Sequence, residues 1–157
     1  MSKWRKWREL SWADRLLLMQ AAVLLVYARV RLPFIDFRAD PDAAERLRSA
    51  APSETLVARA QAIAHLVDIA SAHCPVTVAC LHRSLVLWWL LRRQGIPCEL
   101  RLGAGTESGS FEAHAWVQCV GVALNEQPAN LSRYKPFDEA VIPVGRLPWR
   151  LAARRVS

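Results

Sequence analysis

Apolar side chains in the first half of the chain recur every three or four residues, a period that predicts three long helices. The first covers about residues 12–30, the second about 54–73, and the third begins near Cys80 and ends at Arg93, before Gly95. The first is apolar on nearly all sides, so it must be covered by other protein or lie against an apolar surface. Prolines interrupt residues 33–52, which are predicted to form a connector with one helical turn.

From Ile96 onward the period changes to two, which predicts strands. We expect strands over 97–104, 111–120 and 122–126, with a flexible turn over 105–110. A further short strand is expected near 140–144. Helices followed by an antiparallel meander indicate the α+β class, with N-terminal helices packed on a small antiparallel sheet.

Composition and charge narrow the class of protein. The chain has 157 residues, 53% of them hydrophobic and 22% charged, which fits one folded domain and excludes a disordered chain. The formal net charge of +7 is concentrated at the ends: residues 1–32 carry +5 and residues 145–157 carry +4. Basic ends suit an acidic protein or an anionic lipid surface. We expect no nucleic-acid partner, because such enzymes usually carry their charge across the body.

The expected location is the cytoplasm. The apolar run 16–28 follows basic residues as in a signal peptide, but Glu9 and Asp14 interrupt the basic stretch and no small-residue cleavage site follows. Its 13 residues are fewer than the roughly 20 that span a bilayer. The four cysteines show neither CxxC spacing nor the spacing of a metal site, so we expect reduced thiols and no metal. Gly103-Ala-Gly105 does not precede a helix, so no nucleotide cofactor is expected either.

Cys80 and His114 are the candidate catalytic pair. Cys80 stands where the third helix begins, and backbone N–H groups at a helix N-terminus favour a thiolate. Alternation along 111–120 places His114 on the polar face beside Trp116, while Ala113, Ala115, Val117 and Cys119 face a helix. Each residue alone is more often structural, a buried thiol or a hydrogen-bonded histidine. Together they match a nucleophile and its base.

A third group must orient the imidazole, and two neighbouring residues are candidates. A two-residue turn at Val120-Gly121 would place Asn125 opposite Trp116, on the His114 face of the sheet. A three-residue turn would place Glu126 there instead, because a one-residue slip moves every side chain to the other face. The sequence leaves this choice open.

These residues lie in runs that resemble the lasso-peptide leader peptidases, B-type maturation proteins with a transglutaminase-like, papain-like cysteine protease core. The resemblance extends from about residue 74 to 138. The runs that carry it are Cys80–Pro97 (CLHRSLVLWWLLRRQGIP), Phe111–Val117 (FEAHAWV), Leu124–Glu126 (LNE) and Arg133–Pro136 (RYKP).

The resemblance implies that the chain removes the leader from a ribosomally made precursor, so that a cyclase can close the freed amine onto a carboxylate. It implies Cys80 as nucleophile and His114 as base. The family's third member is an Asp, and Glu126 is the matching position, with Asn125 as the alternative. Residues 53–157 would then form the peptidase core of a single domain, and residues 1–52 a helical lead that docks a partner.

The resemblance also implies the partners: the precursor leader peptide, a separate small leader-binding protein, and the lasso cyclase as a further candidate. Tryptophans and basic residues near the N-terminus favour docking of the leader-binding protein on the first helix, ahead of peripheral contact with a membrane. Asp at Leu17 and Leu24 is expected to weaken that docking. Two other functions stay open, a transglutaminase-type acyl transferase and a non-catalytic peptide-binding scaffold.

Overall fold

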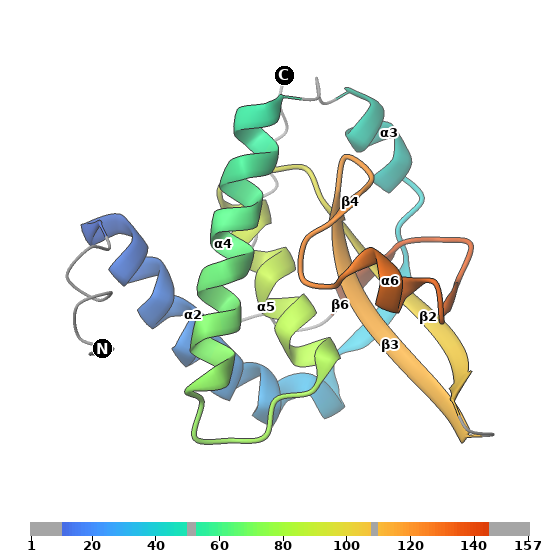
Figure 1. Ribbon diagram of the computed structural model, residues 1–157, viewed down its shortest axis with the longest axis horizontal. Helices are drawn as coiled ribbons and strands as arrows, with labels where there is room; N and C mark the ends of the chain where they lie inside the picture. Colours follow the sequence, from blue (N-terminus) through green and yellow to red (C-terminus); the bar gives the residue numbers. More distant parts are fainter. Residues whose placement is uncertain (1–10, 50–52, 108–109, 145–157) are drawn as a thin grey trace.

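A computed structural model describes residues 11–49, 53–107 and 110–144, and these form one layer of helices packed on one antiparallel sheet. The predicted turn residues 108–109, the tryptophans and basic residues of 1–10, and the arginines of 145–157 lie outside the described residues. Figure 1 shows the three long helices together on one side of the sheet. The expected α+β class is confirmed.

The predicted helices are confirmed as α2 (Trp12–Arg31), α4 (Glu54–Ala72) and α5 (Cys80–Arg93). Local signals explain their ends: Ser11 Oγ accepts a hydrogen bond from the Asp14 backbone N–H at 3.1 Å, and Gly95, with a φ of +72°, follows α5. The helical turn expected in the connector is α3 (Ala43–Ser49).

The sheet has the order β1-β6-β2-β3-β4, with β5 also paired to β2. Its strands are β1 (Asp36–Ala39), β2 (Glu99–Glu107), β3 (Ser110–Cys119), β4 (Val122–Ala123), β5 (Lys135–Pro136) and β6 (Val141–Val144). β2 and β3 form the central hairpin, in which Gly103 is the register partner of His114. The element α6 (Pro128–Leu131) follows β4.

Four features of the sheet differ from the sequence expectation. The strand expected over 122–126 ends at Ala123, and the strand expected to end at residue 104 continues to Glu107. β1 and β5 were not predicted, because neither has an alternating apolar pattern: β1 reads Asp-Phe-Arg-Ala. On β3, Ala115, Val117 and Cys119 are buried as expected, but Ala113 is exposed and Trp116 is buried on the opposite face.

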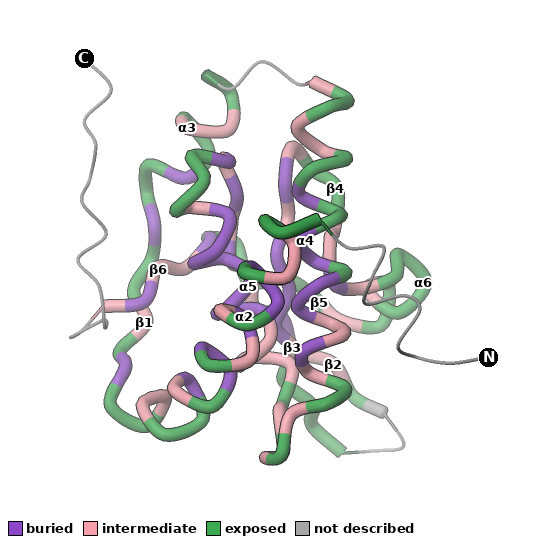
Figure 2. The backbone as a smooth tube through the Cα atoms, turned by 90° about the vertical axis from the view of Figure 1, so that its left-hand side faces the viewer, coloured by how far each residue is buried: buried purple, intermediate pink, exposed green. Residues whose placement is uncertain are grey.

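The core lies where α2, α4 and α5 meet the sheet, and Figure 2 shows the buried stretches of these helices turned toward one another. Its largest fully buried side chains are Trp88, Trp89, Leu25, Ile63, Leu85, Leu87, Leu90, Leu91, Leu100, Val67, Val86 and Val117. Nine of the fourteen residues of α5 are buried, so this helix runs through the centre of the molecule. A central helix gives its first residue, Cys80, a fixed position relative to the sheet.

α2 has one buried and one exposed apolar face. Leu17 and Leu24 belong to the core, so Asp at these positions would disrupt packing rather than docking, which corrects the sequence expectation. The outward face of α2, continued by the short 3-10 helix η1 (Leu32–Phe34), carries a line of large apolar side chains, 39–84% exposed, here called the apolar stripe: Trp12, Leu16, Met19, Val23, Val26, Val30 and Phe34.

The helical segment Trp12–Phe34 is long and apolar enough to cross a membrane by length and composition, and 33% of its most apolar stretch is buried inside the protein. The expectation that the segment is too short to span a bilayer therefore does not hold. The apolar run has 13 residues, but the helix α2 that contains it has 20. A partly buried helix of a folded core passes the same test, so this finding assigns no location.

Candidate active site

His114 and Glu126 form the centre of the candidate site. His114 lies on β3, and its Nε2 is 2.8 Å from Glu126 Oε2, with both side chains mostly buried at 15% and 16% exposure. An ionised carboxylate only accepts hydrogen bonds, so Nε2 carries the proton and donates it to Glu126. In the neutral ring the other nitrogen, Nδ1, then holds a lone pair and can take a proton from a nucleophile.

Glu126 is held in its ionised form. Burial alone would raise the pKa of its carboxyl, but hydrogen bonds from the Asn130 side chain, the Gln127 backbone N–H and His114 together hold that pKa below its ordinary value. The Asn130 and Gln127 donors both reach Oε1, at 2.8 and 3.0 Å, which leaves Oε2 for His114. The carboxylate is therefore fixed at both oxygens.

The turn before Glu126 is the two-residue one, because Cys119 pairs with Val122 and Gln118 with Ala123. Both turn residues have positive φ, +50° at Val120 and +79° at Gly121, as a tight hairpin requires. On the sequence argument this turn should have brought Asn125 to the histidine. That argument is wrong, because the chain leaves the ladder after Ala123 and turns Glu126, not Asn125, toward His114.

Asn125 instead joins α5 to β3. Its side chain is buried, accepts a hydrogen bond from the Val117 N–H at 2.9 Å, and donates one to Ser84 Oγ at 2.8 Å. Ser84, on α5, donates in turn to the Ala115 carbonyl oxygen at 2.8 Å. Sequence reasoning missed Ser84, although a serine inside an otherwise apolar helix face is a signal for a buried hydrogen bond.

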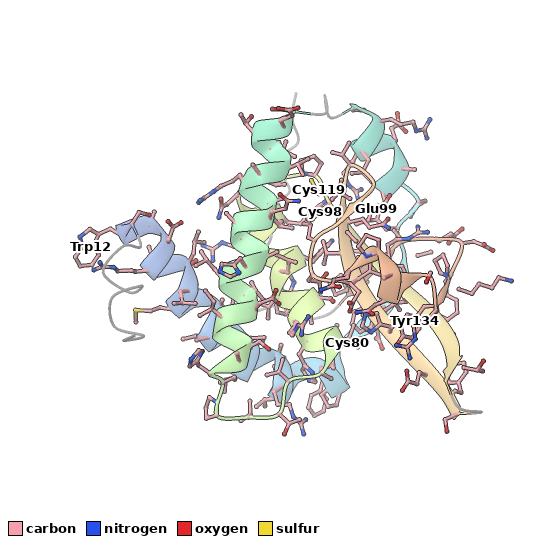
Figure 3. All side chains as sticks on the ribbon, viewed as in Figure 1. Trp12, Cys80, Cys98, Glu99, Cys119 and Tyr134 are labelled. Carbon is pink, nitrogen blue, oxygen red and sulfur yellow. The ribbon has the colours of Figure 1, made fainter. Side chains whose placement is uncertain are left out.

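Cys80 is the first residue of α5 and is partly exposed. Figure 3 shows it at the end of α5 that lies beside β3. It precedes Ser84 by four residues and so shares a helix face with it, and Ser84 contacts the residue next to His114. No hydrogen bond joins Cys80 to His114 among the described residues. Such bonds are often long before a substrate binds.

The N-terminus of α5 is capped by a histidine rather than by a hydroxyl. His82 Nδ1 accepts the Ala79 backbone N–H at 3.1 Å. Burial, with a smaller contribution from Arg29, lowers the pKa of His82, so the ring stays neutral and keeps the lone pair that this bond needs. The first N–H groups of the helix, beside Cys80, have no partner within the helix.

The other cysteines differ from Cys80. Cys98 and Cys119 are buried, and burial raises the pKa of Cys98 to about 12 and raises that of Cys119 as well. Buried thiols of this kind are inert. Cys74 is partly exposed, like Cys80, but lies between α4 and α5.

An open pocket of about 450 Å³ borders the histidine through Tyr134. The Tyr134 ring stacks on the His114 ring, with centroids 4.7 Å apart and planes 17° apart. The pocket is lined by Ala104, Gly105, Thr106, Phe111, Ser132, Arg133, Tyr134 and Lys135. The site thus combines a partly exposed thiol, a base with an ionised partner, and a neighbouring hollow for a side chain.

Comparison with known proteins gives one match. A family model described as the transglutaminase-like superfamily matches residues 22–138, about three quarters of the chain, including Cys80, His114 and Glu126. No curated protein and no solved structure matches the chain.

Proposed function

The chain belongs to the transglutaminase-like superfamily, and from this membership we propose that it is a cysteine peptidase using Cys80, His114 and Glu126. The superfamily includes cysteine peptidases and acyl transferases, which share a thiol nucleophile and its imidazole base. The observation that carries the proposal is the 2.8 Å contact between His114 Nε2 and Glu126. It leaves Nδ1 to act on the thiol at the start of α5.

The proposed reaction has two halves. His114 Nδ1 takes the thiol proton, the Cys80 sulfur attacks the scissile carbonyl carbon, and a C–S bond forms. The imidazolium returns the proton to the leaving nitrogen as the C–N bond breaks, which releases an amine and leaves a thioester. Water then loses a proton to His114 and attacks the thioester, the C–S bond breaks, and the sulfur regains the proton. The products are a carboxylate and the free enzyme.

The proposed substrate is a lasso-peptide precursor, cut between leader and core before macrolactam closure. The support is the resemblance of the runs around Cys80, His114, Glu126 and Arg133–Pro136, and the open pocket beside His114, which suits a peptide side chain. The reaction belongs in the cytoplasm on this proposal, where Cys80 stays reduced. The chemistry needs no metal or organic cofactor.

Product mass tests this function against acyl transfer by the same residues. We expect the full chain, incubated with a precursor and its leader-binding protein, to give two peptides whose masses together equal the precursor plus one water. Transfer to an amine would instead give one product lighter by one ammonia than its two reactants together. An unchanged precursor under all conditions would favour the scaffold alternative.

We propose that the leader-binding protein docks on the apolar stripe of α2. Successive residues of the stripe from Trp12 to Val30 are alternately four and three apart, the spacing of a seam that packs against another helix. Arginines stack on the aromatic rings at both ends: Arg15 lies 5.6 Å from the Trp12 ring and Arg31 lies 5.9 Å from the Phe34 ring. An apolar centre with cationic ends fits a partner that is apolar in the middle and acidic at its rim.

Charge placed on the stripe should weaken docking. We expect Leu16→Glu with Val23→Glu to reduce capture of the leader-binding protein at least about tenfold and to slow precursor cleavage. Alkylation of Cys80 should not change, because both residues are exposed and outside the core. Ala62→Glu, on the exposed side of α4, adds the same kind of charge elsewhere and serves as the control.

Two outcomes would contradict this docking site. One is precursor cleavage that is as fast without the partner as with it at a precursor concentration well below KM. The other is a stripe variant that no longer binds anionic vesicles in a flotation assay but still captures the leader-binding protein. That result would assign the stripe to a membrane surface.

A further inference from the structure

The imidazole of His114 is flanked by aromatic rings. Tyr134 stacks on it with centroids 4.7 Å apart, and Trp116, on the same strand, lies 6.2 Å away with its plane inclined by 20°. Figure 3 shows Tyr134 beside β3, on the segment that follows α6. A ring lying flat against an imidazole restricts its rotation, and the face of an aromatic ring attracts a cation.

Tyr134 is fixed at both ends. Its backbone N–H donates to the Leu131 carbonyl oxygen at 3.0 Å, and its hydroxyl donates to Glu112 Oε2 at 3.1 Å. Glu112 precedes His114 by two residues on β3 and therefore lies on the same face of the sheet. The tyrosine thus bridges its own segment and the histidine strand.

Two glycines of β2 let this segment lie directly on the sheet. A Cβ at Gly105 would come within 2.5 Å of the Arg133 carbonyl oxygen and 3.1 Å of Tyr134 Cδ1. A Cβ at Gly103 would come within 2.9 Å of the Trp116 ring and 3.0 Å of the Lys135 carbonyl oxygen. Only a residue without a side chain permits so close an approach. From the sequence, Gly103-Ala-Gly105 was excluded as a phosphate loop. In the structure these glycines instead allow the backbone around Tyr134 to pack directly on β2.

We propose that Tyr134 is a positioning residue for His114, seated by Gly103 and Gly105. Its ring keeps the imidazole in the plane that directs Nε2 at Glu126, and it stabilises the positive charge that the ring gains with the thiol proton. This inference rests on the proposed function only in the identity of the base. It adds Tyr134, a residue outside the three proposed catalytic residues.

The test uses alkylation of Cys80 by iodoacetamide, followed by mass spectrometry from pH 5 to 9. This small reagent does not need the pocket that Tyr134 lines, so peptide binding does not enter the measurement. Loss of the ring in Tyr134→Leu should lower the alkylation rate below pH 7 by about tenfold and shift the profile toward higher pH, because the thiolate–imidazolium pair is less stable. The conservative Tyr134→Phe keeps the ring and should recover most of that rate.

A second variant tests the seat. Gly105→Ala should shift the profile in the same direction as Tyr134→Leu, because the added Cβ displaces the Arg133 carbonyl oxygen and the tyrosine after it. Circular dichroism checks that each variant folds. If Gly105→Ala does not fold, the profiles of Tyr134→Leu and Tyr134→Phe decide the proposal. Identical profiles in wild type, Tyr134→Leu and Tyr134→Phe would overturn the proposal. A shifted profile without any precursor cleavage by the wild type would overturn the proposed function and leave the role of Tyr134 standing.

Discussion

A Cys80→Ala variant is expected to cut no precursor above background while its fold survives. Alanine has no sulfur to attack the carbonyl carbon, so only substrate binding and the helix N-terminus remain to assist cleavage, and the rate should fall at least about 10⁴-fold. His114→Ala should fall as far, because the thiol then lacks the base that takes its proton. On the proposed mechanism the two residues act as a unit, so the double variant should be no slower than either single one.

Cys74→Ala is the matched control for this experiment. Cys74 is also a partly exposed thiol, but it lies before α5 begins, and its loss should leave cleavage at the wild-type rate. Product formation is followed by mass spectrometry for the four variants and the wild type, and thermal unfolding confirms that they fold. Near-normal cleavage by Cys80→Ala would end the peptidase proposal.

The second large effect is expected at Glu126. In Glu126→Gln the side-chain oxygen should turn toward the Asn130 and Gln127 N–H donors that now reach Oε1, since only an oxygen can accept from them. The amide NH₂ would then face His114 Nε2 and need an acceptor there. The imidazole proton would move to Nδ1, which could no longer take the proton of Cys80. Turnover should fall roughly 10²- to 10⁴-fold with little change in the unfolding temperature.

Asn125→Ala should show the opposite pattern. It leaves the buried Val117 N–H without an acceptor and removes the hydrogen bond that Ser84 Oγ accepts, which should cost about 1–3 kcal/mol of unfolding free energy. The folded protein should retain most of its turnover. Steady-state cleavage and thermal unfolding of both variants show which residue matters more for turnover and which for stability. Lost turnover at an unchanged unfolding temperature in Asn125→Ala, with normal turnover in Glu126→Gln, would transfer the orienting role to Asn125.

The sequence predicted the elements that local signals specify. The helix that begins at Cys80 ends where arginines and Gly95 indicate, and the strand bearing His114 lies within one residue of its expected bounds. The order of strands in the sheet could not be predicted from the sequence, because β1 and β5 are short and lack the apolar alternation that indicates a strand.

The site was predictable only in part, because several of its contacts join distant segments. The choice between Asn125 and Glu126 depended on where β4 ends, and Ser84, 41 residues earlier in the chain, holds Asn125 away from the histidine. The stack of Tyr134 on His114 depends on a segment that returns across β2 over two glycines. The two faces of α2 were indistinguishable for a similar reason: Leu16 and Leu17 are alike in chemistry, and only packing separates them.

The buried bonds from Asn125 through Ser84 to Ala115 have a consequence for regulation. They tie α5 to β3 with no help from a ligand, so the relative position of these two elements is set before any substrate arrives. A leader-binding partner on α2 would therefore not be needed to bring α5 and β3 together. Its contribution would be that of a tether, which raises the effective concentration of the scissile bond near Cys80. Enough precursor in solution should then replace the tether, and the partner would lower KM while leaving kcat as it is.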